Sequence, residues 1–199
     1  MCPHFPQNPD RDSESSSVSR DLARLSHEQI VQAVEWLCSS LRTQREHYLP
    51  LALPLSRPRL DMLSPYFSPG VLEQIRVAEL QGARVPAPDF YAQARAMGFD
   101  NLPQISHMES LTFLDVIVFN EKYSDRGLFH GLVHATQIQV LGLERYAELW
   151  ISSFLKTRAH FTVPLEVQAF SLTSKFLLPQ SERFSVEDEV RQWAGAGRY

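Results

Sequence analysis

The sequence predicts an α+β fold that is mostly helical and carries a small β-sheet. Several segments begin with a helix-capping residue and continue with apolar residues at helical spacing. One segment, residues 110–119, is instead rich in β-branched and aromatic residues and contains neither Gly nor Pro. The 199 residues, 44% of them hydrophobic, are enough to form one domain with a sizeable core, and no internal repeat divides them.

Residues 1–25 are expected to form a disordered N-terminal tail. They contain prolines at positions 3, 6 and 9 and five serines, with almost nothing apolar to bury. We therefore assign residues 26–199 to a single domain behind this tail.

The first helix is expected to begin after Ser26, because Ser26 and Gln29 have the spacing of a capping box. Its apolar residues recur at helical spacing over four or five turns, at Ile30, Val34, Leu37 and Leu41. Prolines 50, 54 and 58 then predict an extended connector.

Two short helices are expected next. Ser68-Pro69 is typical of a helix start and predicts a helix that runs to Ile75. Pro88-Asp89-Phe90 begins another, which Gly98 ends in a left-handed conformation.

Residues 110–119 are expected to form one strand, with Asp115 in its middle. A buried carboxylate needs a partner, so an edge strand with Asp115 facing a cleft is the expected arrangement.

The C-terminal part is expected to be helical. Ser124 or Asp125 caps a helix that ends at Gly142, and a second helix carries Tyr146 and Trp150. Pro164 begins a third helix, which runs to about residue 178, and Ser185 with Asp188 caps a short final helix.

The charge and the cysteine content exclude several classes of protein. The net charge is −4 and no run of basic residues is present, so we expect no nucleic-acid partner. No stretch approaches about 20 apolar residues, so we expect no membrane partner. Two cysteines and no recognisable signal peptide favour a cytoplasmic location. A small-molecule substrate is expected, and the oligomeric state is left open.

The residues that carry chemistry are His130 and His134. Four residues apart on a helix, their imidazoles lie on one face, where both can reach a single ion. Glu166 lies in the first turn of a later helix and can direct its carboxylate at the same ion, and Ala169 allows close helix packing. The expected cofactor is one divalent metal ion held by His130, His134 and Glu166.

The order strand, His-x-x-x-His helix, connecting helix and Glu-x-x-Ala resembles the gluzincin metallopeptidases. It is most similar to small bacterial zincin-like domains that read His-Glu-Leu-Val-His, then Gln, and later Pro-x-Glu. The resemblance covers about residues 105–178 and is specific at His130, His134 and Glu166. It implies a zincin-like fold, with these three residues as the metal ligands.

The chain departs from the family at Gly131, where the family has its catalytic glutamate. That glutamate takes a proton from metal-bound water and delivers it to the leaving amine, which glycine cannot do. Ordinary peptidase activity is therefore not expected, and Gly131 is interpreted either as making space over the metal or as a simple loss of peptidase function.

Two hypotheses of different class follow. Two histidines and one carboxylate also describe non-haem iron(II) oxygenases, which need no protein base, while zinc fits the same ligands. The first hypothesis is therefore a mononuclear metalloenzyme, which would be an oxygenase acting on a small molecule if the metal is iron. The alternative is a degenerate zincin-like module that binds zinc or serves as a scaffold.

Further polar residues are candidates for contact with the substrate or for support of the metal ligands. His107, Glu109 and His160 are expected near the cleft as supporting groups or a substitute acid or base, each with a surface position as the alternative. Tyr123 and Arg126 are candidates for orienting a substrate carboxylate, against the alternative of a turn with a solvated arginine.

Overall fold

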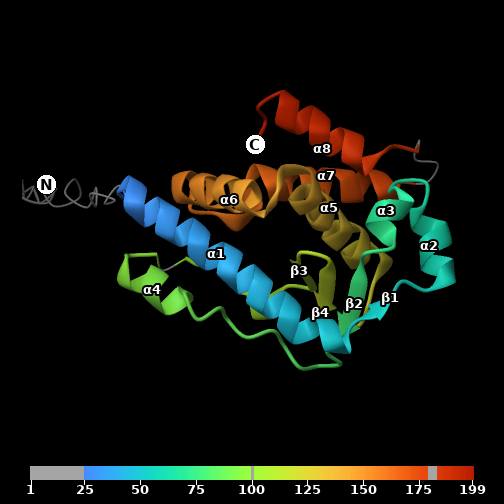
Figure 1. The fold of residues 1–199 in the computed structure, drawn as a ribbon, viewed down its shortest axis with the longest axis horizontal. Coiled ribbons are helices and arrows are strands. Elements are labelled where there is room, and N and C mark those ends of the chain that lie inside the picture. Colours follow the sequence, from blue (N-terminus) through green and yellow to red (C-terminus); the bar gives the residue numbers. More distant parts are fainter. Residues whose placement is uncertain (1–24, 100, 179–182) are drawn as a thin grey trace, which may run out of the picture.

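The computed structural model describes residues 25–99, 101–178 and 183–199 (Figure 1). The predicted tail therefore lies outside the described residues, except for Leu25. The helices and strands follow in the order α1 His27–Tyr48, β1 Leu53–Pro54, α2 Arg57–Leu63, α3 Pro69–Leu72, β2 Arg76–Glu79, α4 Tyr91–Ala96, β3 Ser110–Phe113, β4 Val116–Phe119, α5 Asp125–Leu141, α6 Leu143–Thr157, α7 Pro164–Leu177 and α8 Val186–Gly195. Short 3₁₀ turns lie at Leu49–Leu51, Ile105–His107 and His160–Thr162.

The four strands form one mixed sheet in the order β1-β2-β4-β3. Strands β2 and β4 are parallel, whereas the β1–β2 and β3–β4 pairs are antiparallel. The prediction of an α+β fold, mostly helical with a small sheet, is confirmed.

Both faces of the central strand β4 are covered, so its four residues are all buried. Ile117 and Phe119 belong to the core cluster that includes Leu128 and Leu132 of α5. Val116 and Val118 point to the opposite face and pack with Tyr48 from the end of α1. The alternation of side chains along a strand thus divides the core into two layers.

The predicted single strand over 110–119 is in fact a hairpin. Leu114 and Asp115 form its turn, and Leu114 adopts a positive φ of 59°. Asp115 lies in this turn and not in the middle of a strand, and it lines a second pocket together with Arg45. Its carboxylate accepts two hydrogen bonds from the Arg45 guanidinium, at 2.5 and 2.8 Å. The partner that a half-buried carboxylate needs is therefore an arginine of α1.

The helix starts follow their capping residues. Ser26 and Gln29 form the predicted capping box, Ser124 Oγ accepts from the Gly127 amide, and Ser185 Oγ accepts from the Asp188 amide. Pro164 occupies the first turn of α7, where its missing N–H costs nothing.

The segment between α1 and the hairpin differs most from expectation. The predicted connector contains α2, with Pro58 in its first turn, and the predicted helix over 68–75 ends at Leu72, before strand β2. The helix expected from Pro88 forms as α4, and Gly98 ends it with a φ of 88°.

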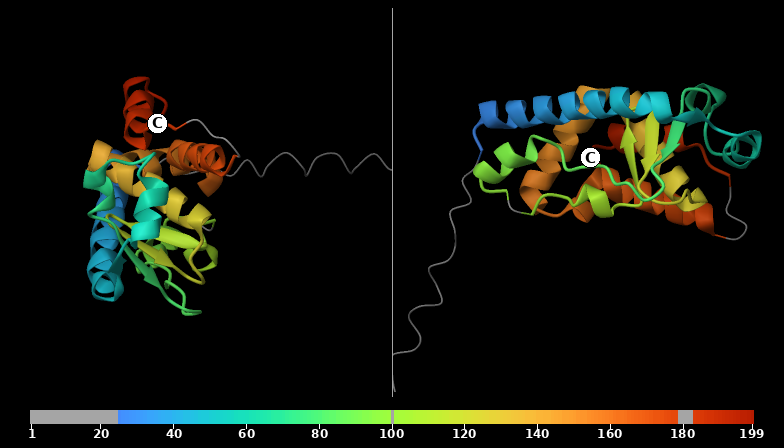
Figure 2. Two further views of the ribbon diagram at one scale, coloured as in Figure 1. Left: turned by 90° about the vertical axis from the view of Figure 1, so that its right-hand side faces the viewer. Right: turned by 90° about the horizontal axis from the view of Figure 1, so that it is seen from below.

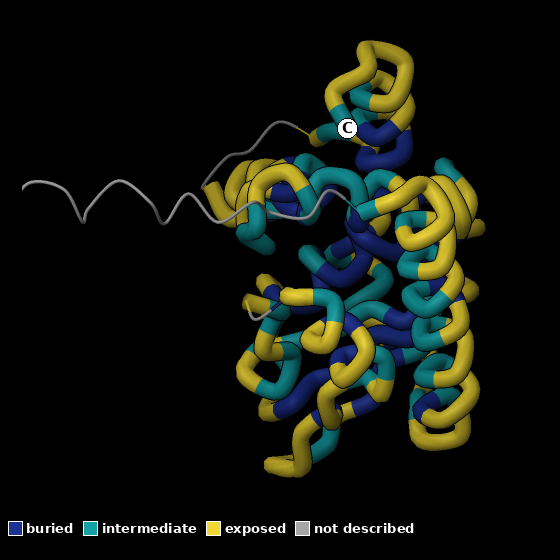
Figure 3. The backbone as a smooth tube through the Cα atoms, turned by 90° about the vertical axis from the view of Figure 1, so that its left-hand side faces the viewer, coloured by how far each residue is buried: buried dark blue, intermediate teal, exposed yellow. Residues whose placement is uncertain are grey.

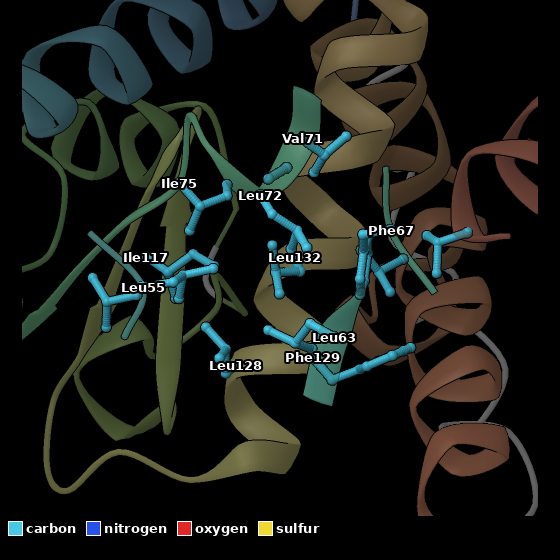
Figure 4. Close-up of a cluster of buried hydrophobic side chains, with 14 of the residues drawn as sticks. Leu55, Leu63, Phe67, Val71, Leu72, Ile75, Ile117, Leu128, Phe129 and Leu132 are labelled. Atoms are coloured by element: carbon cyan, nitrogen blue, oxygen red, sulfur yellow. The ribbon is translucent and has the colours of Figure 1, made fainter. Parts of the chain in front are cut away.

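Helices α5, α7 and α8 lie on one side of the sheet, and the long α1 runs beside α6 (Figures 1 and 2). The largest core cluster joins α2, α3, α5 and the sheet, with Leu63, Phe67 and Phe129 among its side chains (Figure 4). Helix α1 keeps a largely exposed outer side (Figure 3). Among the described residues, no helix has the length and apolar character needed to cross a membrane.

Candidate metal centre

The three predicted ligands converge in the structure. His134 Nε2 lies 3.1 Å from His130 Nε2 and 3.3 Å from Glu166 Oε2. His130 Nε2 lies 3.6 Å from the same carboxylate oxygen. One potential ligand atom from each of the three residues lies within 4.8 Å of the other two, so the described residues include a group that could hold a metal ion.

Two packed helices bring these ligands together. Helix α5 presents both histidines on one face, and α7 packs along that face with the fully buried Ala169. Glu166 is in the first turn of α7 and is itself buried. The small side chain one turn further along α7 allows the close approach of the two helices.

A hydrogen-bond network fixes the ring of His134. The Gln137 amide nitrogen donates to the Leu165 carbonyl and to Gln168 Oε1, each at 3.0 Å, so Gln137 Oε1 is left as an acceptor. This oxygen lies 2.9 Å from His134 Nδ1, which therefore carries the proton in the neutral imidazole. The lone pair of His134 Nε2 then points at His130 and Glu166, the arrangement found in metal-ligating histidines.

The electrostatics of the site reflect burial and mutual proximity. Burial by itself would raise the pKa of Glu166, but the adjacent His134 and His130 outweigh it and hold the pKa well below its usual value. Burial lowers the pKa of His130 and of His160. Burial also opposes protonation of His134, yet Glu166 raises its pKa. Among the described residues, the imidazoles of His130, His134 and His160 are the ion-pairing partners of the Glu166 carboxylate.

His160 completes the surroundings of the carboxylate. Its Nε2 lies 3.5 Å from Glu166 Oε1, the oxygen that the other two histidines do not approach. The ring lies near Trp150 and Phe161, which confine it. The structure thus brings His160 beside Glu166, one of the three predicted ligands.

A cavity of about 630 Å³ leads to the site, and all three ligands line it. His107, Glu109 and Arg126 also line it, as expected for residues near a cleft. Glu109, however, already accepts from Ser124 Oγ and pairs with Arg126 at 3.3 Å, so its carboxylate has partners of its own.

Tyr123 does not line the cavity, and the prediction that it orients a substrate there is wrong. Its hydroxyl donates to Asp125 at 2.6 Å, and the Arg59 guanidinium lies 3.5 Å from the ring centre. The ring also packs against Phe119. The side chain thus supports the start of α5.

Gly131 packs closely against the sheet and also lines the cavity. A Cβ at this position would lie 2.9 Å from Ile117 Cγ2 and 3.1 Å from Thr112 Oγ1, both on the sheet. A Cβ at Gly127, one turn earlier, would likewise lie 2.8 Å from the Phe119 ring and 3.0 Å from the Glu109 carboxyl group. The two glycines therefore allow α5 to approach the sheet, and both also line the cavity beside the three ligands.

Sequence reasoning missed Gln137 and Tyr146 as parts of the site. Gln137 is fully buried, and the Tyr146 hydroxyl lies 3.4 Å from His134 Nδ1. The position of Gln137, three residues after His134 on the same helix, was the available signal. Tyr146 belongs to α6, and nothing in the spacing indicated it.

Comparisons of the chain with protein-family models, with curated proteins and with solved structures find no match in any of the three. The assignment of a function therefore depends on the geometry described above.

Proposed function

We propose that the chain binds one divalent metal ion through His130, His134 and Glu166 and uses it in chemistry on a small molecule. The observation that carries the proposal is the orientation of the ligand atoms: the lone pairs of His134 Nε2 and of the Glu166 carboxylate face one another across a few ångströms. Lone pairs that converge in a buried site repel each other unless a cation or a proton lies between them. A divalent ion satisfies all three ligands at once.

We further propose that the framework is zincin-like. The order of strand β4, ligand helix α5, connecting helix α6 and Glu166 on α7 supports this, together with the sequence resemblance at the three ligands. The proposal concerns the framework and does not extend to peptidase chemistry.

The residues around the site argue against an ordinary peptidase. Gly131 has no side chain, and Glu109, the nearby cavity carboxylate, is occupied by Ser124 and Arg126. A general base must have a lone pair free to take a proton. None of the described residues beside the three ligands fills the place of the family's glutamate.

A two-histidine, one-carboxylate set suits iron(II), as in oxygenases, and it suits zinc as well. Iron would supply a place where dioxygen and substrate meet, and zinc would polarise a carbonyl. This chain contributes orientation and exclusion of water: Gln137 holds His134, His160 lies against Glu166, and an apolar cavity surrounds the reacting end.

The second candidate is a zinc-binding or scaffold module that has lost catalysis. The glycine at position 131 supports it, because that residue now serves helix–sheet packing. Retention of all three ligands and of a large cavity beside them favours the enzyme.

The test is metal analysis of protein purified without chelators or a nickel column. We expect about one iron or zinc per chain, and its loss in each of His130→Ala, His134→Ala and Glu166→Ala. His47→Ala, at an exposed position on α1, is the matched control and should retain the metal. Full occupancy in Glu166→Ala, or a parent protein without stoichiometric metal after anaerobic reconstitution, would contradict the proposal. If iron is bound, oxygen consumption with candidate substrates separates the enzyme from the module.

A further inference from the structure

The walls of the cavity beside the metal site are mostly apolar. Aromatic side chains from four helices and the loops between them face it, among them Trp36, Phe90, Phe99, Trp150, Phe154 and Phe170. Its volume, about 630 Å³, is in the range of sites that enclose a small molecule.

Helix α1 forms one wall of the cavity. The lining residues of that helix recur every three or four positions, from Ala33 through Trp36 and Leu37 to Leu41. Ala33 and Leu41 are eight residues apart, which is about 12 Å along an α-helix, so the apolar wall extends over two turns. Helix α6, which packs against α1, contributes residues from Tyr146 to Leu155, and α4 with the segment after it contributes further lining residues.

One group of polar side chains in the wall lies where His130, His134, Glu166 and His160 meet, and a second group is formed by His107 and the Glu109–Arg126 ion pair. The Nδ1 atoms of His130 and His160 are buried and have no hydrogen-bond partner among the described residues. The remainder of the wall offers mainly carbon, where bound water would find few partners.

We propose that the cavity binds an elongated apolar molecule of the acyl-chain type, with its oxygen-bearing head group at the His130, His134 and Glu166 end. The placement of the head group rests on the proposed metal site, whereas the binding of the chain does not. The chain lies along the wall that α1 and α6 form together and replaces water on a surface that cannot hydrogen-bond to it.

Tryptophan fluorescence tests this directly. Trp36 and Trp150 line the cavity and Trp193 does not. We use the full chain and a fatty acid brominated at mid-chain, dibromostearate, because bromine quenches an indole ring only at close range. Quenching is expected in Trp193→Phe, and none in the Trp36→Phe/Trp150→Phe double variant, whose remaining indole is Trp193.

A series of saturated fatty acids, displacing the brominated probe, tests the shape of the site. Each added methylene should tighten Kd about fourfold until the cavity is full. An affinity independent of chain length, or equal quenching of Trp193, would overturn the assignment.

Two neighbouring serines on α1 provide matched variants. Ser40 lines the cavity, whereas Ser39 is exposed. Ser40→Phe should weaken binding of the longest acids at least tenfold and move the plateau to shorter chains, while Ser39→Phe should leave Kd unchanged. Equal affinities in the two variants would overturn the assignment. If Ser40→Phe fails to fold, the chain-length series on the parent protein still decides.

The same titration on chelator-treated and Zn²⁺-loaded protein separates this inference from the proposed function. Zn²⁺ should tighten binding of the acid several-fold and leave its methyl ester little changed, and no effect on the acid would overturn the head-group placement. Quenching in a protein that binds no metal would support the acyl-chain site and contradict the metal proposal. Stoichiometric metal without quenching would do the reverse.

Discussion

Substitution of Gly131 by Ala tests how α5 packs on the sheet. The new methyl group would lie 2.9 Å from Ile117 Cγ2, 3.1 Å from Ile117 Cδ1 and 3.1 Å from Thr112 Oγ1. Ile117 is fully buried, so it has no free space into which to move. The Thr112 hydroxyl also donates to the Gly131 carbonyl, and the same shift would strain that bond.

Opposing effects set the size of the change. Alanine is the better helix former by about 1 kcal/mol. An extra methyl group in a packed core costs about 1–3 kcal/mol, and a weakened hydrogen bond costs up to about 1 kcal/mol more. We therefore expect Gly131→Ala to lower the free energy of unfolding by about 1–2 kcal/mol. Gly131→Glu should lower the free energy of unfolding further, because its longer side chain has the same close contacts at Cβ and also needs room for its carboxyl group.

Thermal and denaturant unfolding measure this change, with Tm falling by about 2–4 °C for each kcal/mol in a chain of this size. Gly70→Ala is the control, because a Cβ there meets nothing within 4 Å. The loss caused by Gly131→Ala should also shrink in an Ile117→Ala background, as for residues in contact. A Gly131→Ala protein that is more stable than the parent would refute the packing argument.

Three further predictions concern the support of the site, one ion pair and the N-terminus. Gln137→Leu should weaken metal binding by about 10–100-fold in a chelator competition, while Gln139→Leu at an exposed position of α5 should not. Asp115→Asn should cost about 1–2 kcal/mol at neutral pH. Burial opposes ionisation of Asp115, but Arg45 lowers its pKa, so the stabilisation is present above the ordinary aspartate pKa and is lost as pH falls through the lowered one. The difference from the parent in denaturant unfolding should therefore disappear in acid, and a difference that persists there would contradict this assignment. Deletion of residues 1–20 should leave Tm and metal content unchanged, and a clear fall in Tm would show that this segment contributes to stability.

The helices could be predicted because their signals are local. Ser26 with Gln29, Ser124 and Pro164 each act within one turn of their own helix, so the sequence window contains the whole interaction. The same locality made His130 and His134 recognisable as a pair. Glu166 needed only the assumption that two neighbouring helices pack with their polar faces together.

The strands could not be predicted as well, because their partners are distant in the sequence. Strand β2 has four residues and pairs in parallel with β4, about forty residues later. The hairpin turn lacks the usual Gly or Asn, since Leu114 occupies the positive φ position. A turn without its usual residues, between two apolar runs, looks like one continuous strand.

The supporting residues of the site were missed for a related reason. The orientation of Gln137 is fixed by hydrogen bonds to Leu165 and Gln168 of α7. These bonds form only when α5 and α7 pack together. The contact of Gly131 with the sheet was missed as well, because a missing side chain can make room for a ligand, for a neighbouring strand or for both. Only the packed structure shows that Ile117 and Thr112 lie where the Cβ would be.

Helix α5 is enclosed on all sides, and this bears on how rigidly the metal ligands are held. Its sheet side needs the small residues Gly127 and Gly131, while its opposite side offers His130 and His134 to α7. Nearly every residue from Gly127 to Ile138 is therefore buried. A side chain whose helix cannot shift and whose ring is hydrogen-bonded, as in His134, presents its lone pair in one direction before any ligand arrives. Such preorganisation suits the proposed metal centre, which would have to keep its geometry while the proposed apolar ligand enters beside it.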